Sequence, residues 1–225
     1  MFLKTRPAPG FWFTNLHLIG YPIDDYGKEG IVLDENELIR RSKEGDTESF
    51  SQLVLIYERR IINYAFRMLR DQNDAEDAAQ EAFLRAYRKL DSFNGDAAFS
   101  TWLYTILNNI CLDILRKRKR SGEHAQVSIN QSSADDDEYE IQIEDSSPGP
   151  YDSYRKKAAM KALEAAIEKL SDEHKAVIVM RDIHGLEYDE IAKVTGNSLG
   201  TVKSRISRAR IALRKILEED RELFT

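Results

Sequence analysis

Apolar side chains recur every three or four residues through two long parts of the chain, which is the spacing of amphipathic α-helices. In the first part this spacing predicts four helices. Asp34 and Glu37 are expected to form a capping box before the first helix, which ends at Gly45. The other three are predicted to begin at Asp46 or Thr47, near Asp74, and after the loop 91–97. Together the four helices predict one compact domain, residues 34–120.

A second helical part covers residues 155–220 and contains a helix-turn-helix pattern. A short amphipathic helix precedes a tight turn at Gly196, and a longer helix follows. In that longer helix Val202, Ile206 and Ala209 are expected to face inward, because they continue one apolar stripe. The second helix of such a motif fits the major groove of DNA, so the pattern predicts a DNA-binding domain.

Two segments lack helical periodicity. Residues 121–154 are polar, and because residues 121–152 hold nine acids and no Lys or Arg, we interpret this segment as a flexible acidic linker. Residues 1–33 are interpreted as a disordered extension or as a wrongly assigned start. Residues 28–30 can be encoded by a purine-rich ribosome-binding sequence ahead of a start at Leu33. The sequence therefore predicts an all-α protein whose two small helical domains are joined by a flexible acidic linker.

The net charge of −6 does not by itself argue against nucleic acid as a partner, because the charges are unevenly distributed along the chain. Residues 1–120 hold 18 basic and 18 acidic residues, and residues 153–225 hold 15 and 12, so neither part excludes nucleic acid as a partner. The single cysteine, Cys111, excludes an intrachain disulfide and a thiolate metal cluster. No apolar run reaches the roughly 20 residues of a membrane span. These features predict a cytoplasmic protein without a membrane span.

An enzyme is one alternative, since the acids at 135–138 could serve a metal-dependent hydrolase. Catalytic carboxylates need a preorganised pocket, however, and this segment is too polar to form one. The four histidines also lack the spacing of metal ligands. We therefore expect no catalytic residue, no metal and no cofactor.

Three polar surfaces are candidates for binding, and each can also be a solvated helix face. The first is the outward face of the last long helix, which carries Lys203, Ser204, Ser207 and Arg208, with Arg205 and Arg210 at its flanks. The second is the basic run 116–120, which suits phosphate binding or simply favourable charge at a helix C-terminus. The third is the stripe of Asp77, Gln80 and Glu81.

These segments resemble the motifs of one protein family. Residues 77–81 (DAAQE) resemble the region-2 motif with which sigma factors bind the clamp of RNA polymerase. Residues 99–103 (FSTWL) resemble the segment that melts and reads the −10 element, and residues 200–205 (GTVKSR) resemble the recognition helix of region 4. The three occur in the family's order without a region-3 domain between them. The chain thus resembles sigma-70-family factors of the extracytoplasmic-function (ECF) type.

The resemblance implies a role for each matched residue. Core RNA polymerase, through its β and β′ subunits, is expected to contact Asp77, Gln80 and Glu81. The −10 element is expected to contact Phe93, Phe99, Trp102, Asn109, Asp113, Arg116 and Arg118. The −35 element is expected to contact Thr201, Lys203, Ser204, Arg205, Ser207 and Arg208. Core polymerase and promoter DNA are thus expected partners, together with an anti-sigma factor.

A stand-alone helix-turn-helix regulator is the remaining alternative. It explains residues 155–217 but leaves the stripe from Asp77 to Glu81, Trp102 and the basic run without a role. Such a regulator is expected to bind duplex DNA tightly by itself. A sigma factor is expected to bind promoter DNA well only together with core polymerase.

Overall fold

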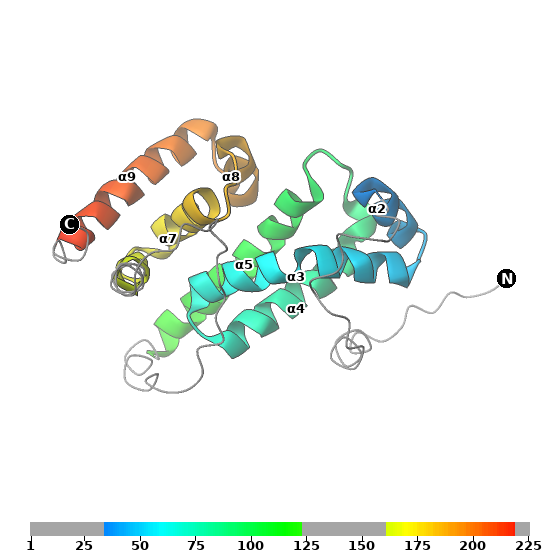
Figure 1. The fold of residues 1–225 in the computed structure, drawn as a ribbon, viewed down its shortest axis with the longest axis horizontal. Coiled ribbons are helices and arrows are strands. Elements are labelled where there is room, and N and C mark those ends of the chain that lie inside the picture. Colours follow the sequence, from blue (N-terminus) through cyan, green and yellow to red (C-terminus); the bar gives the residue numbers. More distant parts are fainter. Residues whose placement is uncertain (1–33, 123–160, 219–225) are drawn as a thin grey trace, which may run out of the picture. The chain divides into compact units, whose positions relative to one another are not determined.

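The computed structural model describes residues 34–122 and 161–218, and every regular element in these ranges is helical (Figure 1). The predicted all-α fold class is confirmed for this part of the chain. The predicted extension 1–33 and all but the first two residues of the predicted linker lie outside the described residues. Two compact units can be distinguished, which divide between Ile110 and Cys111. None of the described helices is long and apolar enough to cross a membrane.

Helices that pack around α3 form the first unit. Its elements are α2 (Glu35–Lys43), α3 (Thr47–Leu69), α4 (Gln72–Lys89), a 3-10 turn (Leu90–Ser92) and the first half of α5 (Phe99–Ser121). α3 packs against both α2 and α4. Ile61 and Tyr64 of α3 are completely buried, and the Tyr64 hydroxyl donates to Oδ1 of Asn108 on α5 at 2.8 Å. This bond fixes α5 against α3 and satisfies a buried amide oxygen.

Short polar side chains determine where α3 and α4 begin. The carboxylate of Asp46 accepts from the backbone N–H groups of Glu48 and Ser49, as one of the two predicted caps of this helix. These bonds, with the Ser49 hydroxyl first, lower the pKa of Asp46. At the next helix Asp71 accepts from the N–H of Asp74 at 2.8 Å, so α4 begins at Gln72 rather than near Asp74.

The predicted capping box at α2 is wrong. Asp34 occupies the N-cap position, but its side chain makes no capping hydrogen bond. The carboxylate of Glu37 instead accepts from Arg40 at 2.8 Å and from Arg41 at 2.7 Å. Hydrogen bonds to these two guanidinium groups lower the pKa of Glu37 to about 2. Because both arginines follow Glu37 by three or four residues, they share its face of the helix and occupy its carboxylate.

The second unit contains the helix-turn-helix. Its elements are the second half of α5, the helical residues 161–168, α7 (Asp172–Ile178), a π-helical turn (Val179–Ile183), α8 (Tyr188–Thr195) and α9 (Leu199–Leu217). Ser171 caps α7, as predicted, by accepting from the N–H of His174. Gly196 ends α8 with φ of 64°, a left-handed conformation that glycine adopts without strain. The turn brings α9 against both α8 and α7, where Val177 and Ile191 are buried.

Candidate nucleic-acid interface

α9 separates an apolar inner face from a polar outer face, as its sequence predicts. Val202, Ile206 and Ala209 are at most 2% exposed. The exposed side chains are Lys203, Ser204, Ser207 and Arg208. The guanidinium of Arg208 lies along the helix surface, where Nη2 is 3.4 Å from Oγ of Ser204. These four residues, which are four of the six predicted −35 contacts, thus form one continuous polar surface on the first half of α9.

Thr201 and Arg205 lie differently from the other four predicted −35 residues. The Thr201 N–H donates to Oγ of Ser198 at 3.2 Å, and the two hydroxyls are 2.9 Å apart. Ser198 therefore caps the helix, and Thr201 supplies the N–H group that is capped. Nη2 of Arg205 is 3.0 Å from a carboxylate oxygen of Glu173 on α7. This pair directs the Arg205 guanidinium along the protein and away from the exposed face.

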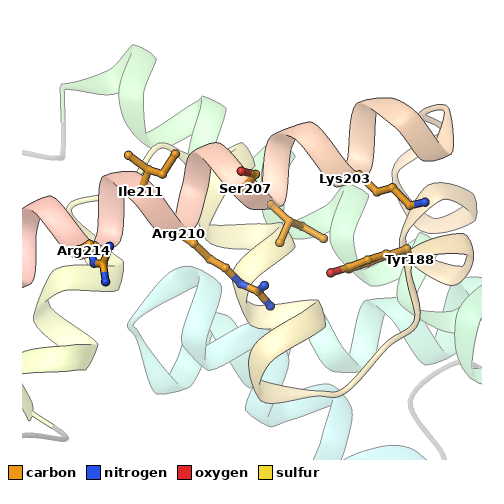
Figure 2. Close-up of a pocket in the computed structure, with 7 residues that line it drawn as sticks. Tyr188, Lys203, Ser207, Arg210, Ile211 and Arg214 are labelled. Carbon is orange, nitrogen blue, oxygen red and sulfur yellow. The ribbon is translucent and has the colours of Figure 1, made fainter.

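A groove beside α9 extends the polar surface beyond the predicted residues. It encloses about 330 Å³ and is lined by Tyr188, Lys203, Ile206, Ser207, Arg210, Ile211 and Arg214. Figure 2 shows Lys203 near the Tyr188 ring at one end and Arg214 at the other. Both Nε and Nη2 of Arg210 donate to the carboxylate of Asp182, which raises the pKa of Arg210.

Part of this groove could have been found from the sequence. Lys203, Ser207, Arg210 and Arg214 follow one another at spacings of four, three and four residues, which continues one helix face. Tyr188 carries no such signal, because it reaches the groove only through the fold. Its ring is stacked by the guanidinium of Arg181, whose Cζ lies 4.8 Å from the ring centroid.

In the first unit, three aromatic side chains form a cluster at the start of α5. The ring centroid of Phe93 lies 5.2 Å from that of Trp102 and 5.6 Å from that of Phe99. Phe99 is 1% exposed and Phe93 8%, whereas Trp102 is partly exposed. Lys43 of α2 donates to the backbone carbonyl of Phe93. Of the three predicted −10 residues here, Trp102 presents surface to a ligand, and the two phenylalanines support it.

A loop precedes this cluster and bends tightly. The side-chain oxygen of Asn94 accepts from the N–H of Asp96 at 3.3 Å, and Gly95 between them has φ of 82°. All three residues are exposed. This hydrogen bond closes a tight turn, which exposes polar groups next to the aromatic cluster. Because the residue at the tip is glycine, no bulky side chain covers them.

α5 continues as one helix with an outward stripe that begins at Trp102. Asn109, Asp113 and Arg116 follow at offsets of 7, 11 and 14 residues and are exposed. Oδ1 of Asp113 accepts from Nη1 of Arg116 at 2.7 Å. Arg118 lies about 200° around the helix from Arg116, since each residue advances by about 100°. The structure thus places Arg116 on the predicted −10 surface and Arg118 on another face.

The predicted polymerase contacts share one surface of α4. Asp77 is exposed, and Gln80 and Glu81 are partly exposed. A carboxylate oxygen of Glu81 lies 2.6 Å from Nε of Arg85, one turn further along the helix. The opposite face is apolar: Ala78, Ala79, Ala82 and Phe83 are buried. The stripe is therefore available to a partner without disturbing the core.

Two features of the described ranges concern the predicted absence of a metal site and of a reactive thiol. No group of three or more His, Cys, Asp or Glu residues there has the geometry of a metal site. The one cysteine, Cys111, is completely buried, and desolvation raises the pKa of its thiol to about 12. A thiol in that state is a poor nucleophile.

Comparison with known families assigns both units. The Sigma-70 region 2 model matches residues 53–121, and the Sigma-70 region 4 model matches residues 160–213. The ECF RNA polymerase sigma factor SigW of Bacillus subtilis is 36% identical over 189 residues, which cover 80% of this chain and 95% of the relative. The chain belongs to the ECF sigma factor family. The RNA polymerase sigma-H factor of Pseudomonas aeruginosa is 33% identical and covers 82% of this chain and 94% of the relative.

As an ECF sigma factor, the chain directs promoter-specific initiation of transcription and is not an enzyme. The match to region 2 excludes the stand-alone regulator. Among solved structures, CnrH in complex with the cytosolic domain of CnrY is 25% identical, with a TM-score of 0.58, and covers 81% of this chain and 96% of that chain. The sigma factor RpoE from Bartonella quintana, in complex with the anti-sigma factor NepR, is 27% identical with a TM-score of 0.56, covering 76% of this chain and 98% of that one.

Proposed function

We propose that the outer face of α9 reads the −35 element of the promoter. Lys203, Ser204, Ser207 and Arg208 supply the contacts to base edges and phosphates. The observation that carries this proposal is the division of residues 202–209 of α9, where Val202, Ile206 and Ala209 are at most 2% exposed while these four side chains face solvent. A recognition helix positioned in this way enters the major groove with its N-terminal half, where Arg binds a guanine edge bidentately.

The surroundings of α9 supply phosphate contacts. Arg210 and Tyr188 line the groove next to Lys203, and a guanidinium and a phenol are both suitable donors to phosphate oxygens. Arg205 and Thr201 act indirectly, because Glu173 and Ser198 occupy their polar groups. Their contribution is to hold α9 against α7 and to start the helix.

The start of α5 opens and reads the −10 element. Trp102 stacks on unpaired bases, and the loop at Asn94–Asp96 lies beside it to receive a flipped base. Asn109 contacts base edges further along the same stripe. Arg116 contacts the strand's phosphates, while Phe93 and Phe99 keep the Trp102 ring in position.

Polymerase binding is assigned to the α4 stripe of Asp77, Gln80 and Glu81. In this assignment the region 2 domain comprises residues 34–120 and the region 4 domain residues 155–220, with the acidic linker between them. The structural neighbour RpoE is bound by an anti-sigma factor. By that likeness, we expect this protein to act in the cytoplasm and to be held inactive by an anti-sigma factor of its own.

The −35 assignment can be tested by run-off transcription with core polymerase over a set of single-base −35 variants. Arg208→Ala should relax the preference at one position, with a loss of about 1–3 kcal/mol of discrimination there. Lys203→Ala, if that ammonium binds phosphate, should weaken all variants about equally. Lys215→Ala is the matched control, since Lys215 is an exposed cation on the same helix, two turns beyond Arg208. An unchanged variant profile for Arg208→Ala would remove α9 as the reader.

The polymerase assignment has a separate test. Replacing Gln80 with Ala and Glu81 with Lys should abolish co-purification with core polymerase while the helical circular dichroism stays the same. Because Glu81 pairs with Arg85, Arg85→Ala serves as the control for loss of that pair alone. If the double variant still binds core polymerase, the stripe is only a solvated face.

A further inference from the structure

The groove beside α9 combines cations with an apolar floor. Lys203, Arg210 and Arg214 are its cations, and Ile211 and Tyr188 supply apolar surface (Figure 2). Ile211 is 66% exposed, the highest value among the large hydrophobic side chains of the described residues. Asp182 partly neutralises Arg210, but no described carboxylate pairs with Lys203 or Arg214. The groove therefore suits a ligand that is both acidic and apolar.

DNA phosphates account for the cations of this groove but not for its apolar floor. A phosphate is bound by cations and N–H or O–H donors and gains nothing from an isoleucine. An exposed apolar side chain rimmed by charged residues is instead typical of a protein interaction site. The occupant should thus be a peptide segment whose acids meet the cations while its apolar side chains cover Ile211 and Tyr188.

One segment of this chain has that composition. Residues 135–145 read DDDEYEIQIED, with seven acids and no basic residue. Within it Tyr139, Ile141 and Ile143 alternate with polar positions, so an extended chain presents all three on one side. Acids flank the three apolar residues on both sides. Both the acidic charge and the apolar side chains of this segment therefore complement the groove.

The length of chain also permits this contact. Fifteen residues lie between Asp145 and Lys161, the first residue of the described range 161–218, and this stretch spans up to about 55 Å when extended. The 19 residues of α9 extend over only about 28 Å. The connecting stretch is thus about twice as long as the helix along which the groove runs. A tether of this kind supplies an effective concentration of about millimolar, so even a weak contact is populated.

We propose that residues 135–145 dock into the groove lined by Tyr188, Lys203, Arg210, Ile211 and Arg214 and compete there with promoter DNA. The proposal rests on the proposed −35 function of α9. Lys203 and Ser207 belong to both surfaces, so a docked segment covers part of the DNA-reading face. Any partner that binds residues 135–145 elsewhere releases α9 for the −35 element. Binding of such a partner to the acidic linker thereby favours recognition of the −35 element.

Cysteine cross-linking tests the contact in the full chain without DNA. Cys111 is the only native cysteine and is completely buried, so two introduced thiols are the reactive ones. The pair Ile143→Cys with Ser207→Cys should form an intrachain disulfide quickly under mild oxidation, because position 143 lies on the side of the extended segment that faces the groove. The matched control pairs Ile143→Cys with Lys193→Cys, because Lys193 is exposed on α8 but does not line the groove. Equal rates for the two pairs, or disulfides between two chains, would overturn the proposal.

Binding of a −35 duplex by the full chain without polymerase gives the second test. Replacing Tyr139, Ile141 and Ile143 with Ser removes the apolar contact but keeps all seven acids. This variant should bind the duplex about tenfold more tightly if the docked form outnumbers the free form by about ten to one. Unchanged affinity would overturn docking and leave only general charge repulsion by the acids.

The two proposals fail in distinguishable ways. If Arg208→Ala in the released variant leaves base discrimination unchanged, the −35 assignment is wrong, whatever the cross-linking result. If cross-linking is unselective while Arg208→Ala relaxes discrimination, the −35 assignment stands and the docking proposal is wrong.

Discussion

The two helices proposed to face DNA, one in each unit, have different kinds of interaction around them. Trp102 on α5 rests on Phe93 and Phe99, with ring centroids 5.2 and 5.7 Å away. α9 instead is bordered by ion pairs, which join Arg210 to Asp182 and Arg205 to Glu173. Aromatic packing is insensitive to salt, whereas exposed ion pairs are screened by it.

This difference matches the nucleic acid that each helix is proposed to bind. Unpaired bases of an opened −10 element offer flat apolar faces, and a fixed aromatic ring is complementary to them. A −35 duplex offers phosphates and groove edges, which require cations and hydrogen-bond donors. The comparison predicts that the two steps of promoter recognition respond differently to mutation and to ionic strength.

The largest effect should come from unfolding the second unit while the first unit stays folded. Val202 is 1% exposed, so Val202→Asp places an unpaired charge among apolar neighbours and should cost at least about 3–5 kcal/mol. Urea unfolding followed by circular dichroism should show the second unit unfolded and the first one retained. Ser207→Asp, on the exposed face of the same helix, should remain folded. A loss of all helical signal in Val202→Asp would show that the units depend on each other.

The next effect should separate stacking from charge. Trp102→Ala removes the exposed ring and should reduce opening of the −10 element by about 1–3 kcal/mol per stacked base. Permanganate reactivity of unpaired thymines, measured with core polymerase, reports this opening. Trp102→Phe keeps a ring on the cluster and should retain most of the activity. If Trp102→Ala opened promoters normally, the aromatic cluster would be only part of the core.

A smaller effect concerns the helix cap at Asp46. Asp46→Ala should destabilise the first unit by about 1 kcal/mol at neutral pH, because the Glu48 and Ser49 N–H groups lose their acceptor. The pKa of Asp46 is lowered in the folded state, so its stabilising contribution is present above the unfolded value and disappears as pH falls through the folded one.

Thermal unfolding across a pH series checks this sign. The difference between the native protein and Asp46→Ala should narrow below about pH 4, where an unfolded Asp side chain gains its proton. Asp46→Ser keeps a neutral acceptor, and its difference from the native protein should follow the same trend while remaining smaller. A constant difference at all pH values would show that the charge of Asp46 contributes nothing.

The smallest effect should appear only as salt is varied. Arg210→Gln should reduce the salt slope of −35 duplex binding by about one unit, worth about threefold in affinity between 50 and 200 mM salt. Binding titrations at several salt concentrations measure it. Trp102→Ala should leave that slope unchanged, because its ring carries no charge. If both variants changed the slope alike, the contrast between the two helices would be wrong.

The fold could be predicted from the sequence wherever a local signal decided it. Asp46, Ser171 and Gly196 are short-range caps, and each acts as its position indicates. The capping box at Asp34 failed because Arg40 and Arg41 compete for the carboxylate of Glu37. The capping-box rule considers only the N-cap residue and the residue three positions after it. Arg40 and Arg41 lie further along the helix, so the rule does not take them into account.

The site was predicted less completely, because several of its contacts join residues far apart in the chain. The outward face of α9 follows from helical spacing alone. The pairs of Arg205 with Glu173 and of Arg210 with Asp182 connect residues 32 and 28 positions apart, and no periodicity indicates them. Tyr188 enters the groove for the same reason. Phe93 and Phe99 were expected at the DNA, but their rings are buried beneath Trp102.

The π-helical turn at Val179–Ile183 has a consequence for how this domain tolerates change in length. In a π turn the hydrogen bond spans five residues, and here the N–H of His184 donates to the carbonyl of Val179 at 3.0 Å. The turn therefore contains one residue more than an α-helical segment of the same length along the helix axis. Deleting one residue from it should restore ordinary helical geometry while rotating Asp182 away from Arg210. A one-codon deletion in this segment is thus expected to leave the helix-turn-helix in place while removing the Asp182–Arg210 ion pair.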